Sequence, residues 1–180
     1  QDNKYIYLHS KGGIGSDNIN TDIPLELSGY SFPKEVRDKK EAIDLSLETL
    51  NLAKHDITIP LLSMTYLAPL VGLIAEGNRT PNFVLWVYGL TGSRKTSASL
   101  AFLNHFGNFS SNIPPASFKD TANAIELKAH TLKDSLLLID DYHPNIDGSD
   151  ARKLASTAER ILRMYGDRVG RSRMRADTTL

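Results

Sequence analysis

The chain has 180 residues, of which 41% are hydrophobic, and this composition fits one globular domain, or one domain and part of a second. Its 21 basic and 21 acidic residues cancel, so the chain as a whole lacks the basic excess of many nucleic-acid-binding proteins. The absence of cysteine excludes disulfides and thiolate metal sites, and it agrees with a cytoplasmic protein.

The first 33 residues are predicted to form a small β-rich segment. Residues 5–9 and 23–27 have the apolar content of short strands, with a glycine-rich turn at residues 12–15 between them. We do not interpret this turn as a dinucleotide-binding fingerprint, because a polar loop follows it where that fingerprint needs a helix.

Residues 34–80 are predicted to be helical and to lead into the third region, residues 81–180. The apolar spacing over residues 34–53 predicts an amphipathic helix or a short pair of helices, and Pro60 is expected to start the next helix. The most apolar stretch, residues 59–75, is expected to be shorter than a bilayer span and to lie in the core. Residues 78–81 form the expected linker.

Residues 83–96 read as a buried strand, a phosphate-binding loop and the start of a helix. In the phosphate-binding P-loop pattern, one glycine is followed by four residues and then by Gly-Lys-Ser/Thr. Gly89, Lys95 and Thr96 stand at this spacing, but Arg94 occupies the position of the second glycine. The alternative is a turn between a strand and a helix that contains Lys-Thr by chance.

If the loop binds phosphates, its residues have distinct roles. Backbone amides around Thr91, Gly92, Ser93 and Arg94 are expected to surround the phosphates, together with the positive end of the following helix. Lys95 is expected to neutralise phosphate charge, and the Thr96 hydroxyl to bind Mg²⁺.

A second apolar run, residues 135–139, ends in Asp140 and Asp141 and resembles a Walker B strand. Ligands of open α/β sheets bind at the carboxyl ends of the strands, so this pair and the loop are expected to meet around one nucleotide. Asp140 is then the expected Mg²⁺ ligand, and Asp141 the carboxylate that orients or deprotonates the attacking water. Taken alone, the Asp-Asp pair is equally well explained as a turn.

Other polar residues have simpler explanations. Thr121 is a candidate helix N-cap, His105 is expected to be packed or at the surface, and His143 lacks the partners of a metal ligand. Basic residues between positions 152 and 163 fit a solvated helix face. The glycine- and arginine-rich residues 166–175 suit a loop that offers guanidinium groups to phosphates, or a basic loop with no specific role.

The order of these pieces resembles the ATPase region of phage and mobile-element primase-helicase proteins, the domain-of-unknown-function family 927. The resemblance rests on residues 7–9, 12–15, 60–62, 66–70, 89–96, 121–123, 133–135, 140–141 and 166–175, in the same order. It implies a RecA-like α/β core, a tolerated non-glycine residue before the lysine, and an arginine finger at Arg171 or Arg173. Because a RecA-like sheet has more strands after Walker B, the chain is expected to be part of a longer protein.

The resulting expectation is a Mg²⁺-dependent ATPase motor of a DNA helicase, acting in replication in the cytoplasm of a bacterial host. Its expected ligands are ATP and Mg²⁺, and its expected partners are single-stranded or forked DNA and further copies of the chain in a hexameric ring. The alternatives are a regulatory module that binds nucleotide without turnover, and a DNA packaging or defence ATPase.

Overall fold

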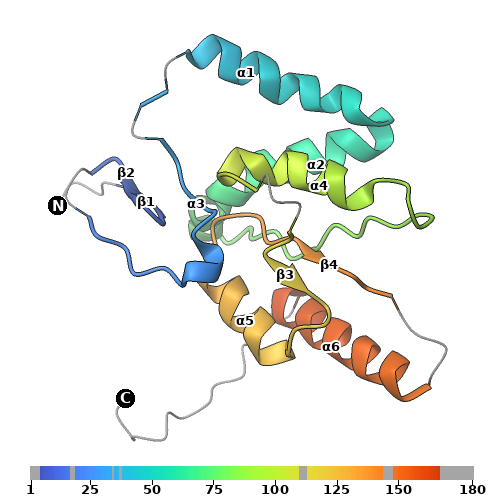
Figure 1. Cartoon of the computed structure of the whole chain (residues 1–180). Coiled ribbons are helices and arrows are strands. Elements are labelled where there is room, and N and C mark those ends of the chain that lie inside the picture. Colours follow the sequence, from blue (N-terminus) through green and yellow to red (C-terminus); the bar gives the residue numbers. More distant parts are fainter. Residues whose placement is uncertain are drawn as a thin grey trace, which may run out of the picture.

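The computed structural model describes residues 5–16, 19–33, 35–36, 38–109, 113–143 and 148–166. A small parallel pair of strands lies at the centre, with one group of helices on one side and a second group on the other (Figure 1). The first group contains α1 (Lys39–Glu48), α2 (His55–Leu67) and α4 (Lys95–Leu103), and the second contains α5 (Ala122–Thr131) and α6 (Gly148–Gly166).

The N-terminal segment forms a hairpin, in which β1 (Tyr7–His9) pairs antiparallel with β2 (Gly12–Ile14). The first predicted strand is therefore confirmed in part, but the predicted glycine-rich turn is itself mostly a strand. The strand predicted over residues 23–27 is wrong, because Leu25–Leu27 is a 3₁₀ helix. Pro24 precedes this helix with φ −49°, and Leu27 at its end is buried in the core at 1% exposure.

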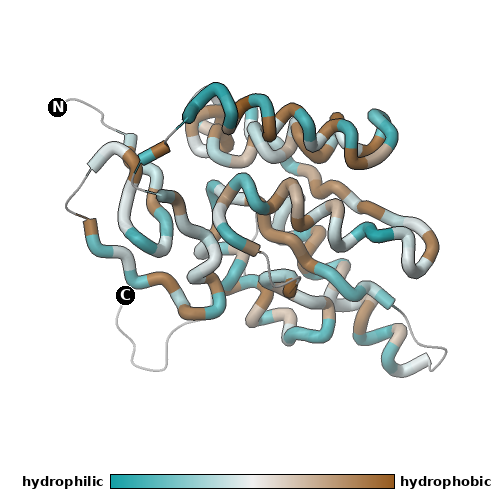
Figure 2. The backbone as a smooth tube through the Cα atoms, turned by 45° about the horizontal axis from the view of Figure 1, so that its top comes forward, coloured by the Kyte–Doolittle hydropathy of each residue, from teal (hydrophilic) through white to brown (hydrophobic). Residues whose placement is uncertain are grey.

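Residues 38–53 form the short helical pair that the apolar spacing predicts. The Asp38 side chain caps α1 by accepting hydrogen bonds from the Lys40 and Glu41 amides at 2.8 and 3.0 Å. A 3₁₀ turn, η2 (Thr49–Leu52), follows α1 directly. Several apolar side chains of α1 stay exposed, and teal and brown residues alternate along this helix in Figure 2.

The next helix begins earlier than predicted. α2 starts at His55, with Pro60 inside it, and continues through η3 (Ala68–Leu70) into α3 (Val71–Glu76). The run His55–Glu76 spans 22 residues and contains an 18-residue window with a mean hydropathy of 1.8, so the prediction that this segment is too short for a bilayer is wrong. Among the described residues it is the one helix long and apolar enough to cross a membrane, a property that core helices of soluble proteins share.

Two apolar clusters stabilise the fold. One joins Leu100, Leu103 and Phe106, at the end of α4 and just beyond it, to Leu27 and Tyr30 of the N-terminal segment. The other packs Phe118 and Ile125 against Ala158 and Ile161 of α6. Arg160 reinforces the second cluster, because its guanidinium donates to Glu126 and Asn123 of α5. This residue is half-buried between two helices and does not belong to the predicted solvated face.

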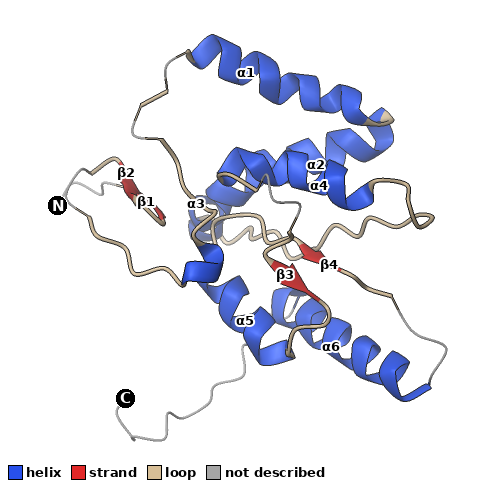
Figure 3. Ribbon diagram, in the orientation of Figure 1, coloured by secondary structure: helices blue, strands red, loops and turns tan. Residues whose placement is uncertain are grey.

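The central sheet is smaller than the sequence predicts. β3 (Ala116–Ser117) pairs parallel with β4 (Ile139–Asp140), with Ala116 opposite Ile139. The predicted strand over residues 83–88 is wrong, since in the described chain this segment is extended but pairs with no strand (Figure 3). Without a pairing partner it is not buried as predicted, and Phe83, Trp86 and Tyr88 are 55%, 44% and 87% exposed. The RecA-like sheet therefore stays a prediction.

Candidate nucleotide-binding site

The predicted phosphate-binding loop is a compact turn followed directly by a helix. The Ser93 amide donates to the Leu90 carbonyl at 3.2 Å, and Gly92 sits at the third position of this turn with φ 81°. Helix α4 begins at Lys95, so the predicted helix after the loop is confirmed. The loop therefore ends at the amides of a helix N-terminus, where the helix dipole favours an anion.

Arg94 adopts a backbone conformation in which glycine is the preferred residue. Its φ is 60° and its ψ 28°, in the left-handed region, immediately before α4. This is the position at which the P-loop pattern has glycine. The departure from the pattern is therefore accommodated by a strained arginine in a backbone conformation suited to glycine.

Replacing Arg94 by glycine is expected to stabilise the fold by about 0.5–1 kcal/mol, because relief of left-handed strain exceeds the entropy that glycine loses on folding. Thermal unfolding followed by circular dichroism measures this. The matched control is Gly92→Ala, since a Cβ there meets no atom within 4 Å and only the φ of 81° is strained. That variant should lose stability by a similar amount. A lower unfolding temperature for Arg94→Gly together with a higher one for Gly92→Ala would contradict this explanation from backbone strain.

The Lys95 side chain folds back over its own loop. Its amine donates to the carbonyl oxygens of Gly89 and Leu90 at 2.9 and 2.8 Å, and it approaches Ser93 Oγ at 3.5 Å. These acceptors are neutral and lie at the rim of the loop. A phosphate is a stronger acceptor for an ammonium group than a carbonyl, so the amine is placed to exchange these contacts for an anion.

Thr96 and Asp140 meet across the site, as the two motifs predict. The Thr96 hydroxyl on α4 donates to Asp140 Oδ2 at the end of β4, with 2.7 Å between the oxygens. The two residues are 44 positions apart, so this contact joins the loop to the acidic strand end. A hydroxyl and a carboxylate are hard oxygen ligands, and these two residues would suit Mg²⁺ bound together with phosphate oxygens.

Asp141 points to a different partner. Its Oδ2 lies 2.5 Å from the ammonium nitrogen of Lys119, in the loop between β3 and α5. The hydrogen bond to Asp141 raises the pKa of Lys119. Asp141 has φ 68°, a left-handed conformation that turns the chain sharply after Asp140. The two successive carboxylates thus contact different elements, Asp140 the start of α4 and Asp141 the loop before α5.

The neighbouring loop is held by a second ion pair. Lys128 of α5 donates to Asp120 Oδ2 at 2.9 Å, and this contact lowers the pKa of Asp120. The Ser117 amide also donates to Asp120 at 3.3 Å, and the Thr121 hydroxyl accepts from the Ala124 amide at 3.2 Å. The predicted Thr121 cap is therefore confirmed. Together these bonds fix the backbone that carries Lys119.

Most of the side chains described above line one cavity of about 1490 Å³, among them Lys95, Thr96, Lys119, Asp140 and Asp141. Its walls are formed by the phosphate-binding loop, residues 85–88, residues 138–143, the loop after β3 and the first turns of α6. The volume exceeds the few hundred to 1,000 Å³ typical of small-molecule pockets, so a nucleoside triphosphate has enough room. The cavity is thus lined by residues of both sequence motifs.

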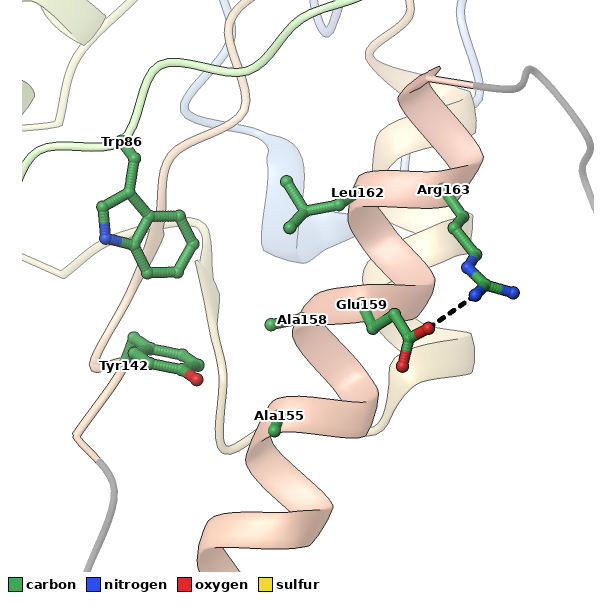
Figure 4. A pocket seen from close by; sticks show the side chains of 7 residues that line it. All are labelled: Trp86, Tyr142, Ala155, Ala158, Glu159, Leu162 and Arg163. Atoms are coloured by element: carbon green, nitrogen blue, oxygen red, sulfur yellow. Dashed lines mark ion pairs between the residues drawn. The ribbon is translucent and has the colours of Figure 1, made fainter.

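An aromatic cluster also lines this cavity. The rings of Trp86 and Tyr142 meet edge to face with centroids 5.0 Å apart, and both contact Phe118, at 5.9 and 5.1 Å. Figure 4 shows Trp86 and Tyr142 facing α6 across an open groove of about 550 Å³. On α6 this groove is lined by Ala155, Ala158, Leu162 and the ion pair of Glu159 with Arg163.

The structure brings most predicted site residues together. The residues that line the cavity are Gly89, Thr91, Gly92, Arg94, Lys95, Thr96, Asp140 and Asp141, and Ser93 contacts Lys95 from the loop. Arg171 and Arg173 lie outside the described residues. Sequence reasoning missed Lys119, Asp150 and Lys153, which line the same cavity from other elements.

Neither His105 nor His143 was predicted to bind a metal, and the two residues lie in different surroundings. His105 donates from Nδ1 to the Phe102 carbonyl at 2.8 Å, so Nε2 accepts from the Ser46 hydroxyl at 2.7 Å, which places the ring in a packed network. His143 lines the cavity beside Asp141. Within the described residues, His, Asp and Glu side chains form no cluster of three that could hold a metal ion.

Comparisons with known proteins add no identification. No protein-family model, curated protein or solved structure was found to match this chain. The resemblance to primase-helicase ATPases therefore stays an expectation, and the arguments about function rest on the geometry of the site.

Proposed function

We propose that this chain binds a nucleoside triphosphate with Mg²⁺ and hydrolyses it. The observation that carries the proposal is the 2.7 Å hydrogen bond between Thr96 and Asp140. It joins a loop of phosphate-binding pattern to an acidic strand end, next to an amine whose hydrogen bonds within the described chain go to neutral carbonyls and a hydroxyl. A turn with an accidental Lys-Thr has no reason to meet an Asp-Asp strand end in one large cavity.

In the proposed mechanism the loop amides and Lys95 bind the phosphates, and the helix dipole of α4 adds to their field. Thr96 and Asp140 supply hard oxygen ligands to Mg²⁺, which when bound neutralises charge on the phosphate oxygens. Asp141 orients the attacking water and takes up its proton. An arginine of a neighbouring copy, Arg171 or Arg173, completes the site in a ring.

We further propose ATP as the nucleotide and movement on DNA as the coupled work. This finer proposal is supported by the resemblance in motif order to phage and mobile-element primase-helicases. A DNA packaging or defence motor uses the same site chemistry and is the alternative within that class.

A regulatory module without turnover is favoured by one specific observation. Arg94 bears backbone strain at the position where the P-loop pattern has glycine, and a loop that relieves this strain when phosphates bind would hold them without aligning them for attack. Steady-state ATP hydrolysis by the 180-residue chain, with and without single-stranded DNA, separates the two functions. A motor predicts turnover that DNA stimulates, whereas tight ATP binding with no turnover in either condition would favour the regulatory module.

A further inference from the structure

We propose that Lys119 is a second phosphate-binding cation of this site, held by Asp141 until a nucleoside triphosphate arrives. The inference rests on the proposed function and deepens it. It assigns a role to a residue outside both sequence motifs, in the loop between β3 and α5.

The topology places Lys119 at the same edge of the sheet as Asp140 and Asp141. β3 and β4 run parallel, with Ser117 opposite Asp140, so the residues that follow both strands emerge at the same edge. Two contacts then link this edge to the phosphate-binding loop. Thr96 contacts Asp140, and the next residue, Asp141, contacts Lys119. Lys119 also lines the same cavity as Lys95.

The ion pair of Lys119 with Asp141 is suited to exchange for a contact with phosphate. The Lys119 and Asp141 side chains are 76% and 50% exposed, and exposed ion pairs contribute little to stability. Among the ion pairs of the described residues, this is the one that reaches the proposed catalytic carboxylate. Lys128 differs, because it is half as exposed as its partner Asp120 and stabilises the loop itself.

The charges of the cavity favour the same exchange. Its lining contains four acidic residues, Asp120, Asp140, Asp141 and Asp150, and four basic residues, Arg94, Lys95, Lys119 and Lys153. A triphosphate adds several negative charges, and a more highly charged anion competes with one carboxylate for a mobile ammonium group. Transfer of Lys119 from Asp141 to the terminal phosphate would leave Asp141 unpaired, and therefore able to accept the proton of the attacking water.

This exchange couples the release of Asp141 to the presence of a terminal phosphate. ATP would free the carboxylate, whereas ADP would leave it paired with Lys119. The specific prediction is that Lys119 distinguishes ATP from ADP.

The test is calorimetric titration of the chain with Mg-ATP and Mg-ADP. Lys119→Ala should weaken ATP binding roughly tenfold and change ADP binding much less, and Lys119→Arg should restore ATP affinity. Lys133→Ala is the matched control, because it removes an exposed lysine that does not line the cavity. Circular dichroism of each variant checks that the fold is retained, which the high exposure of Lys119 predicts.

A second background separates a direct contact from an indirect one. In Asp141→Asn the partner charge is gone, and asparagine tolerates the left-handed backbone at this position. If Lys119 contacts phosphate, its replacement by alanine still weakens ATP binding in this background. If that effect disappears, Lys119 acts only through Asp141 and the inference is overturned.

Equal loss of ATP and ADP affinity in Lys119→Ala, or no loss, would also overturn it. A failure of the proposed function gives a different result. In that case the wild-type chain would bind no nucleotide, or the Lys95→Ala variant would bind nucleotide as tightly as the wild type.

Discussion

Replacing Lys95 by alanine is expected to lower the affinity for Mg-ATP by about 10- to 100-fold, the value of one or two charge-assisted hydrogen bonds to phosphate. The amine now contacts the carbonyls of Gly89 and Leu90, and these contacts are the ones that a phosphate would replace. Alanine has the highest helix propensity, so α4 should still begin at position 95. Calorimetric titration measures the change directly.

Lys133→Ala serves as the control for this prediction too, since it removes the same charge from outside the cavity. ATP affinity should be unchanged in the control. If both variants bind ATP as the wild type does, the loop at residues 89–96 is not the phosphate site.

Replacing Asp141 by asparagine is expected to lower the rate of ATP hydrolysis by about 10²- to 10⁴-fold, the usual contribution of a general base, without weakening ATP binding. Binding should be kept because the phosphates are held by the loop and Lys95, while Asp141 contacts Lys119. Asparagine is the right replacement, because alanine would add strain at a φ of 68° and mix a folding effect with a chemical one. Steady-state phosphate release measures the rate.

The control for this variant is Glu159→Gln, which neutralises an exposed carboxylate of α6 that pairs with Arg163 and does not line the large cavity. Its rate should equal that of the wild type. An Asp141→Asn protein that hydrolyses ATP at the wild-type rate would remove Asp141 from the mechanism.

The parts of the site that depend on local sequence could be predicted from it. The turn at residues 90–93, the start of α4 at Lys95 and the cap at Thr121 all follow from residues within four positions of one another. The meeting of Thr96 with Asp140 was predicted from two strands that end at one sheet edge. The contact forms although residues 83–88 pair with no strand in the described chain, and only Ile139 of the strand predicted over residues 135–139 lies in β4.

The parts that depend on distant partners could not be predicted in the same way. The apolar residues 83–88 have the composition of a buried strand, but a strand forms only where another edge offers hydrogen bonds, and here none does within the described chain. Lys119 escaped notice for a related reason. Its position depends on a two-residue parallel pairing, Ala116–Ser117 with Ile139–Asp140, which is too short to leave a periodic pattern.

Arg94 shows a third kind of difference. The sequence marks it as a departure from the phosphate-binding pattern, but only the backbone reveals how the departure is accommodated. A φ of 60° means that the loop keeps the glycine conformation and bears the strain. The backbone at this one position therefore keeps a conformation suited to glycine, in spite of the changed residue.

The measurement that tests the central claim most directly is calorimetric titration of the wild-type chain with ATP, once with Mg²⁺ and once with EDTA. The Thr96–Asp140 pair predicts saturable binding of one ATP per chain with Mg²⁺, and clearly weaker binding when the metal is removed. Absence of binding in both conditions would contradict the account, and binding that ignores the metal would show that Thr96 and Asp140 hold no Mg²⁺.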